Sequence, residues 1–167
     1  MKLKSLLFGL LMVMSVGVKA SGNLSSMQAS YIVNFLRLIK WPDVNTSNTF
    51  IIGVYGDSQT YEQLVNYTKN RKVGTKSIEI RKINSSKEAA ICQVIFVPVV
   101  NSSKILELQN NLGNKPCLII SEKEGMNNSG STIEFVIQND RLKFRINETR
   151  AKQQNLSLSK SLIDMSV

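Results

Sequence analysis

Few residues of this 167-residue chain have the types and spacing that catalysis or metal binding needs. The chain contains no histidine, which removes the commonest metal ligand, the usual general base and any Ser-His-Asp arrangement. Its two cysteines cannot form a zinc site by themselves. A site built from Asp, Glu or a Lys nucleophile stays open, but no spacing singles one out. We therefore expect a protein that is not an enzyme and that uses no metal and no cofactor.

Two places in the sequence could hold a ligand. Gly56 and Asp57 follow a predicted strand, Thr49–Tyr55, and precede a predicted helix, Gln59–Lys69. Open α/β sheets bind ligands outside the carboxyl ends of their strands, so both residues are candidates for a ligand crevice, with a helix cap as the plainer role for Asp57. The stretch lacks the glycine spacing of dinucleotide sites. Trp41 is the only tryptophan. Packing at a helix end is a plainer role for it than forming a ligand platform.

The first 20 residues have the pattern of a secretory signal peptide. Lys2 and Lys4 precede an apolar run, Leu6–Val18, which ends close to a small residue, Ala20. The run is shorter than the roughly 20 residues that a membrane-spanning helix needs. We predict a signal peptide over residues 1–20, cleaved after Ala20, and a single exported domain over residues 21–167.

The chain is basic, with a formal net charge of +9, part of which belongs to the predicted signal peptide. Export argues against a nucleic-acid partner, and no arginine-rich run interleaved with aromatic residues suggests one. Anionic lipid headgroups or an acidic protein face fit the charge better. A basic surface that is simply solvated fits it equally well.

Cys92 and Cys117 could form a disulfide. Each is expected near the start of a buried strand, and one helix joins the two strands. If the strands are neighbours, the two Cα atoms would lie about 5 Å apart, inside the roughly 4.4–6.8 Å window of disulfides. An exported protein meets an oxidising compartment that permits the bridge. Free buried cysteines are also common, so the sequence leaves both states open.

The centre of the predicted fold is Cys92–Val100, an apolar stretch rich in β-branched residues. Such a run is typical of a strand covered on both faces, with a buried helix segment as the alternative. The other predicted elements before the C-terminal part are helix Met27–Lys40, strand Thr49–Tyr55, helix Gln59–Lys69, strand Lys76–Ile83, a helical turn Ser85–Ala90, helix Ser102–Leu112 and strand Lys115–Ser121. This alternation favours an α/β domain with a largely parallel sheet and right-handed crossovers.

The C-terminal part has a different pattern. Two alternating stretches, Thr132–Ile137 and Leu142–Ile146, flank an Asn-Asp turn and predict an antiparallel β-hairpin. Asn147 is expected to cap a helix that ends near Gln154. The last predicted element is a short amphipathic helix, Leu156–Met165.

With its elements placed, the chain resembles the YfiR/HmsC-like family from about Met27 to Ser166. The stretches that carry the resemblance are ASYIVNFLRLIKWP, FIIGVYGDS, CQVIFVPV, KPCLIISEKEGM and STIEFVIQNDRLKFRINETRAKQQNLSLSKSLI. The last is the most specific. The family usually shows a Gly-Gly pair and an Ile-Asn pair where this chain has Ser129-Gly130-Ser131 and Ile133-Glu134.

The resemblance implies a single Rossmann-like α/β domain in the periplasm. It also implies a repressor that binds the periplasmic part of an inner-membrane diguanylate cyclase and so controls cyclic-di-GMP and biofilm formation. An outer-membrane lipoprotein as a further partner and a homodimer are compatible with this role. The alternative function is a periplasmic module that binds or senses a small ligand at the Gly56-Asp57 crevice.

The hairpin is the candidate partner surface. Arg141 and Lys143 lie at or near its tip, beside apolar residues that include Phe144. A basic rim around apolar residues is typical of a docking patch, although a solvated hairpin would have the same composition. Since the family resemblance is strongest here, we name Arg141, Lys143 and Phe144 as candidate partner-binding residues.

Overall fold

The computed structural model describes residues 20–42 and 47–167. The predicted signal peptide lies outside these residues, except for Ala20, and stays a prediction. Among the described residues, no helix has the length and apolar character that crossing a membrane would require.

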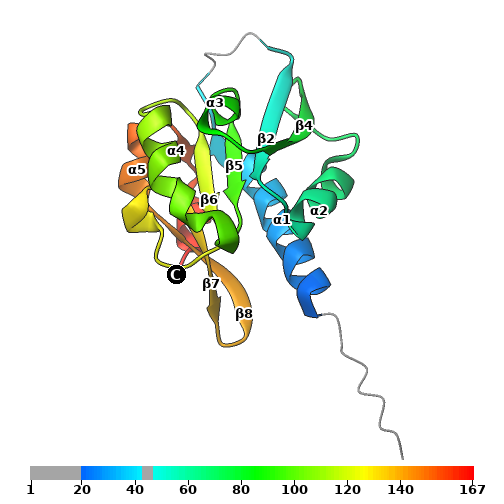
Figure 1. Ribbon diagram of the computed structural model, residues 1–167, viewed down its shortest axis with the longest axis vertical. Coiled ribbons are helices and arrows are strands. Elements are labelled where there is room, and N and C mark those ends of the chain that lie inside the picture. Colours follow the sequence, from blue (N-terminus) through cyan, green and yellow to red (C-terminus); the bar gives the residue numbers. More distant parts are fainter. Residues whose placement is uncertain (1–19, 43–46) are drawn as a thin grey trace, which may run out of the picture.

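The structure alternates helices and strands along the chain (Figure 1). The helices are α1 (Ala20–Leu38), α2 (Gln59–Thr68), α3 (Ser86–Ala89), α4 (Ile105–Leu112), α5 (Glu148–Gln153) and α6 (Lys160–Asp164), with 3-10 turns η1 (Val99–Lys104) and η2 (Asn127–Ser129). The strands are β1 (Ile39–Lys40), β2 (Thr49–Tyr55), β3 (Lys72–Val73), β4 (Lys76–Ile83), β5 (Val94–Val97), β6 (Leu118–Ser121), β7 (Ile133–Gln138), β8 (Arg141–Ile146) and β9 (Ser157–Leu158).

Seven strands form one mostly parallel sheet in the order β3-β4-β2-β5-β6-β7-β8. The five strands from β4 to β7 are parallel to their neighbours, whereas β8 pairs antiparallel with β7 and β3 antiparallel with β4. The order jumps from β4 across β2 to β5, which is the strand reversal of a doubly wound, Rossmann-like sheet. The predicted α/β class, with a largely parallel sheet and a C-terminal antiparallel hairpin, is confirmed.

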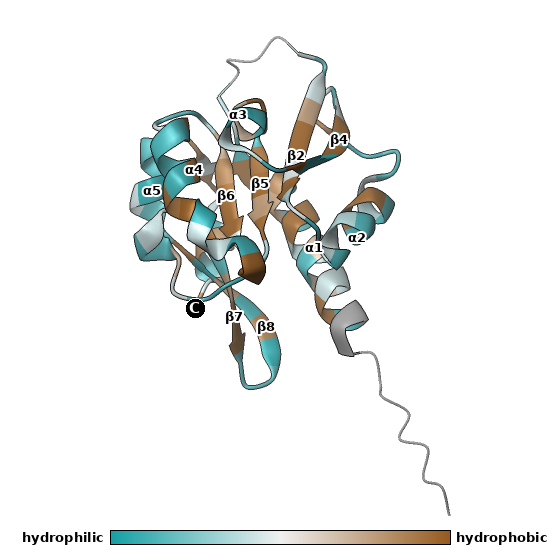
Figure 2. Ribbon diagram, in the orientation of Figure 1, coloured by the Kyte–Doolittle hydropathy of each residue, from teal (hydrophilic) through white to brown (hydrophobic). Residues whose placement is uncertain are grey.

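Each face of the sheet has its own hydrophobic core. On one face, α1 and α2 cover residues such as Ile52, Phe96 and Ile120. On the other, α3 and α4 cover Ile95 and Ile119. Figure 2 shows β5 and β6 as hydrophobic strands between helices that carry hydrophilic residues on their outer sides. Burial on both faces explains why these strands read as unbroken apolar runs rather than alternating ones.

An aromatic cluster joins α1 to the C-terminal hairpin. Phe35 of α1 lies edge-on to Phe144 of β8, with ring centroids 4.9 Å apart, and stacks on Phe135 of β7 at 6.3 Å. Tyr31, one turn earlier, contacts the same two rings and donates its hydroxyl hydrogen to the carbonyl of Leu142 at 3.2 Å. Burying each phenylalanine contributes about 1.5–3 kcal/mol to folding. The hairpin is therefore anchored by α1.

The structure differs from the predicted elements at several boundaries. The first helix begins at Ala20, seven residues before the predicted start. The central strand is only Val94–Val97, because Pro98 has no N–H with which to continue the ladder. The last predicted helix is shortened to α6, since Ser157–Leu158 pair with β1 instead. The paired strands β1 and β9, like β3, have only two residues each. Such strands are too short to show an alternation of apolar and polar residues in the sequence.

Replacing Ile95 by Asp should abolish folding. Ile95 is fully buried in β5, and an unpaired carboxylate there would lose its hydration without gaining a partner. Ile95→Val is the matched control, because the loss of one methylene group should cost only about 0.5–1.5 kcal/mol. Thermal melting followed by circular dichroism would check both. A soluble Ile95→Asp protein with a cooperative melt would contradict the placement of this strand.

Candidate functional site

The described segments that leave β2, β5 and β6 meet at the carboxyl end of the sheet. These strands are neighbours, so the turns that follow them lie side by side. The turns are Gly56-Asp57-Ser58, Pro98-Val99-Val100 and Glu122-Lys123-Glu124. Open α/β sheets bind their ligands at this end, which makes it the candidate functional site.

A buried polar network ties these turns to α1. The Thr60 hydroxyl donates to Gln28 Oε1 at 2.9 Å, and Gln28 Nε2 donates to Glu122 Oε1 at 3.0 Å. The second carboxylate oxygen of Glu122 accepts the N–H of Val99 at 2.9 Å. Gln28 and Thr60 are almost completely buried, so losing a partner would cost about 1–3 kcal/mol. The network fixes the positions of three strand ends relative to one helix.

Beside this network lies an apolar groove. A hollow of about 340 Å³ separates the start of α1 from the hairpin, and a second of about 230 Å³ reaches toward α2. The two share Leu24, Gln28, Val99 and Glu122, and we call them together the carboxyl-end groove. Three apolar residues on its walls are unusually exposed: Val99 at 49%, Val100 at 82% and Ile137 at 59%. Clustered apolar exposure of this kind is typical of an interaction site.

The sequence-predicted crevice residues take different roles in the structure. Asp57 lines the smaller hollow, but its carboxylate is 93% exposed and pairs with Lys82 Nζ at 3.0 Å, which raises the pKa of Lys82. The cap of α2 is Ser58, not Asp57, because Ser58 Oγ accepts the N–H of Thr60. Gly56 does not line the hollow. It adopts φ +68°, and a Cβ there would lie 2.8 Å from Asn101 Oδ1, so it permits a tight turn.

The predicted partner-binding residues are divided between surface and core. Arg141 is exposed and Lys143 half-buried on one face of the hairpin, whereas Phe144 is only 2% exposed on the other face. Placing Phe144 on a docking surface was therefore wrong, because the strand alternation turns it toward Phe35. The predicted Asn-Asp turn is present: Asn139 and Asp140 have φ of 51° and 56°, which suits a two-residue hairpin loop.

The outer edge of the hairpin is partly occupied. The carbonyl of Leu142 accepts the Tyr31 hydroxyl, and the carbonyl of Phe144 accepts the N–H of Val167 at 3.1 Å. These two carbonyls of β8 are not available to an added strand. At the opposite edge of the sheet, β3 has only two residues. Side chains of the groove and hairpin tip are thus better suited to a partner than backbone pairing is.

Glu134 occupies the position at which the chain departs from the Ile-Asn pair. It is 3% exposed, and its Oε2 accepts the N–H of Asn127 at 2.8 Å. Its other oxygen lies 3.5 Å from Arg145 Nη1, which also contacts Glu124 at 2.6 Å. A side-chain amide could accept the same backbone N–H. The carboxylate does so with an added charge, which Arg145 offsets.

The structure holds Cys92 and Cys117 as free, buried thiols. The strands they precede are neighbours as expected, but Val94 pairs with Leu118, so the two cysteines are not opposite each other. Burial raises the pKa of Cys92 to about 11 and the pKa of Cys117 well above its ordinary value. Both thiols are therefore protonated at neutral pH and unsuited to act as nucleophiles.

The described residues of this end offer apolar surface and hydrogen-bonded polar groups, which suit binding. Within residues 20–42 and 47–167, no group of three or more Cys, Asp and Glu side chains could hold a metal ion. The polar groups of the network are engaged with one another. Sequence reasoning missed Gln28, Glu122 and the exposed valines. The position of Glu122 directly after a buried strand was the available signal, while Gln28 carried none.

The family model described as YfiR/HmsC-like matches residues 25–167. No curated protein matches the chain.

Thiol titration should distinguish free cysteines from a disulfide. In guanidinium chloride without reductant, we expect both cysteines of the chain to react with Ellman's reagent. In the native state at pH 8 neither should react, because burial keeps them protonated and inaccessible. Their raised pKa values also mean that the free energy of unfolding falls as the pH rises above the ordinary thiol value. Absence of reactive thiol in the unfolded, unreduced protein would instead show that the bridge forms.

Proposed function

Because this chain belongs to the YfiR/HmsC-like family, we propose that it is a non-catalytic periplasmic regulator of an inner-membrane diguanylate cyclase. In this proposal it binds the periplasmic part of the cyclase and represses it, which lowers cyclic-di-GMP and biofilm formation. The observation that carries the proposal is the family match over residues 25–167. The secretory pattern of residues 1–20 supports the assignment to the periplasm.

The carboxyl-end groove and the hairpin tip support a binding role. Val99, Val100 and Ile137 provide exposed apolar surface at the groove, and Arg141 and Lys143 add basic charge on the other face of the adjoining hairpin. Figure 1 shows the β7–β8 hairpin extending beyond the rest of the sheet, where a partner can reach it. An apolar centre with a polar rim is the usual anatomy of a protein–protein interface. We assign the cyclase to this surface.

A small-ligand site at Gly56-Asp57 is less well supported. The hollow that Asp57 lines has a volume of about 230 Å³, below the roughly 300–1,000 Å³ of small-molecule pockets. The Asp57 carboxylate is almost fully exposed and already paired with Lys82. Such a group contributes little to ligand affinity. We therefore favour protein binding at this end of the molecule.

Charge reversal at the hairpin tests the proposed surface. In a deletion strain that expresses Arg141→Glu with Lys143→Glu, cyclic-di-GMP should stay as high as in the deletion strain itself. The reason is that the two introduced negative charges would repel the acidic partner surface that Arg141 and Lys143 face in this proposal. The double change Lys69→Glu with Lys152→Glu, at exposed positions outside the groove and hairpin, is the matched control and should restore repression.

Mass spectrometry of cyclic-di-GMP, with protein levels checked by blot, measures the result. If deletion leaves cyclic-di-GMP unchanged, the repressor proposal fails. If deletion raises it and the hairpin variant restores repression like the wild type, the function stands and the chosen residues are wrong.

The apolar wall of the groove provides a second test in the same strain. Val100→Asp combined with Ile137→Asp should weaken binding by about tenfold or more, since central apolar contacts each contribute about 1 kcal/mol or more. Both side chains are mostly exposed, so thermal stability should change little. The matched control is Val65→Asp with Ile91→Asp, which places the same substitutions at exposed apolar positions elsewhere. Equal loss of repression in both double variants would contradict a specific role for the groove.

A further inference from the structure

A larger hollow opens at the opposite, amino end of the sheet. Its volume is about 700 Å³, which lies within the range of small-molecule pockets. Four parts of the described chain contribute to it: the end of α1 and β1, the start of β2, the turn between β3 and β4, and the segments that lead into β5 and β6. We call it the amino-end hollow.

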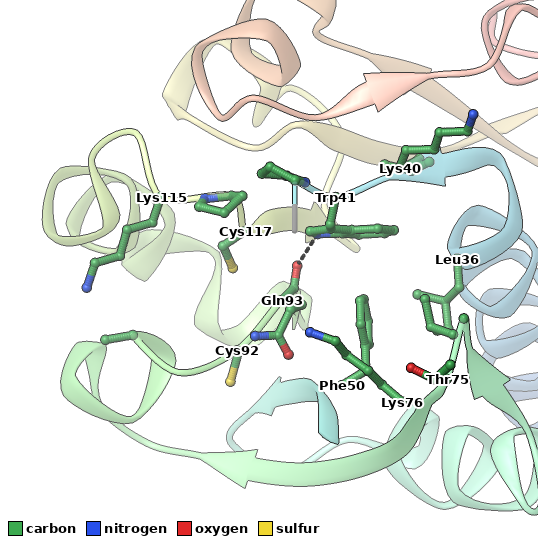
Figure 3. Close-up of a pocket in the computed structure, with 16 residues that line it drawn as sticks. Leu36, Lys40, Trp41, Phe50, Thr75, Lys76, Cys92, Gln93, Lys115 and Cys117 are labelled. Atoms are coloured by element: carbon green, nitrogen blue, oxygen red, sulfur yellow. Dashed lines mark hydrogen bonds between the residues drawn. The ribbon is translucent and has the colours of Figure 1, made fainter. Parts of the chain in front are cut away.

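The apolar wall of this hollow is built around Trp41. The indole N–H donates to the carbonyl of Gln93 at 3.1 Å, a carbonyl that also accepts the N–H of Leu118 at the start of the β5–β6 ladder. The ring lies edge-on to Phe50, with centroids 5.0 Å apart and planes at 87°. Figure 3 shows Trp41 above Phe50, with Leu36 beside them. The hydrogen bond and the ring contact hold the indole in place while leaving it only half-buried.

The charged residues that line the described wall of the hollow all have one sign. They are Lys40, Lys76 and Lys115, and no Asp or Glu of the described residues lines it. Figure 3 shows Lys40 and Lys115 on opposite sides of the hollow. Both are exposed, so their flexible stems can follow the apolar wall while their ammonium groups stay at the rim. An apolar interior with a cationic rim is complementary to a molecule with an apolar body and an anionic head.

We propose that the amino-end hollow binds a small amphipathic anion of the medium-chain fatty-acid class. The acyl chain lies against Trp41, Phe50 and Leu36, and the carboxylate lies at the rim that carries Lys40 and Lys115. The site is at the end of the sheet remote from the carboxyl-end groove. Its existence does not depend on the proposed repression of a cyclase, so the two can fail separately.

Fluorescence of Trp41 reports on the proposed site directly, because it is the only tryptophan of the chain. Titrating the mature protein with decanoate, below its micelle concentration, should produce a saturable change in intensity or wavelength. Decanol has the same chain without the charge and should bind about tenfold more weakly, and decyltrimethylammonium more weakly still. This comparison uses the unaltered protein and needs no variant to fold.

A pair of lysine variants tests the rim. Lys40→Gln combined with Lys115→Gln should weaken decanoate binding by about tenfold and leave decanol binding unchanged. Lys69→Gln combined with Lys152→Gln removes the same charge from exposed positions outside the hollow and should bind decanoate like the wild type. The proposal is overturned if decanoate gives no saturable change, if decanol binds as tightly as decanoate, or if the two double variants weaken binding equally.

Discussion

The fold depends on covering both faces of the central parallel strands at once. Residues of β5 point alternately to α1 and to α4, and Val94, Ile95, Phe96 and Val97 are all fully buried. Neither face can be left to water without exposing a large apolar area, at a cost of about 25 cal/mol per Å². The helices therefore have little freedom in where they lie. The connections between the parallel strands place these helices on both faces of the sheet.

This requirement leaves the two ends of the sheet as the places where function can reside. At the carboxyl end, the buried network of Thr60, Gln28 and Glu122 holds the strand exits together and leaves apolar side chains exposed around a groove. At the amino end, Trp41 closes one side of a hollow by bonding to the sheet through Gln93. The two ends differ in character, because the groove mixes both signs of charge while the described lining of the hollow carries only lysines among its charged residues.

The hairpin shows how strand alternation and helix packing divide one element between two roles. Leu142 and Phe144 point into the core under α1, and Arg141 and Lys143 point away from it. Because two outer carbonyls of β8, those of Leu142 and Phe144, bond to Tyr31 and Val167, the hairpin edge is only partly open to pairing. Covering part of an edge strand in this way disfavours uncontrolled pairing with other chains.

The sequence by itself determined the fold class and most of the elements. The apolar runs, the Asn-Asp turn and the Asn147 cap depend on near neighbours, so local patterns identified them. Only the tertiary structure decided which residues meet at the ends of the sheet. Gln28 and Glu122 are 94 positions apart and Trp41 and Gln93 are 52 apart, and no local period relates such pairs. Phe144 illustrates the same limit, because its alternation was visible but the face that α1 would cover was not.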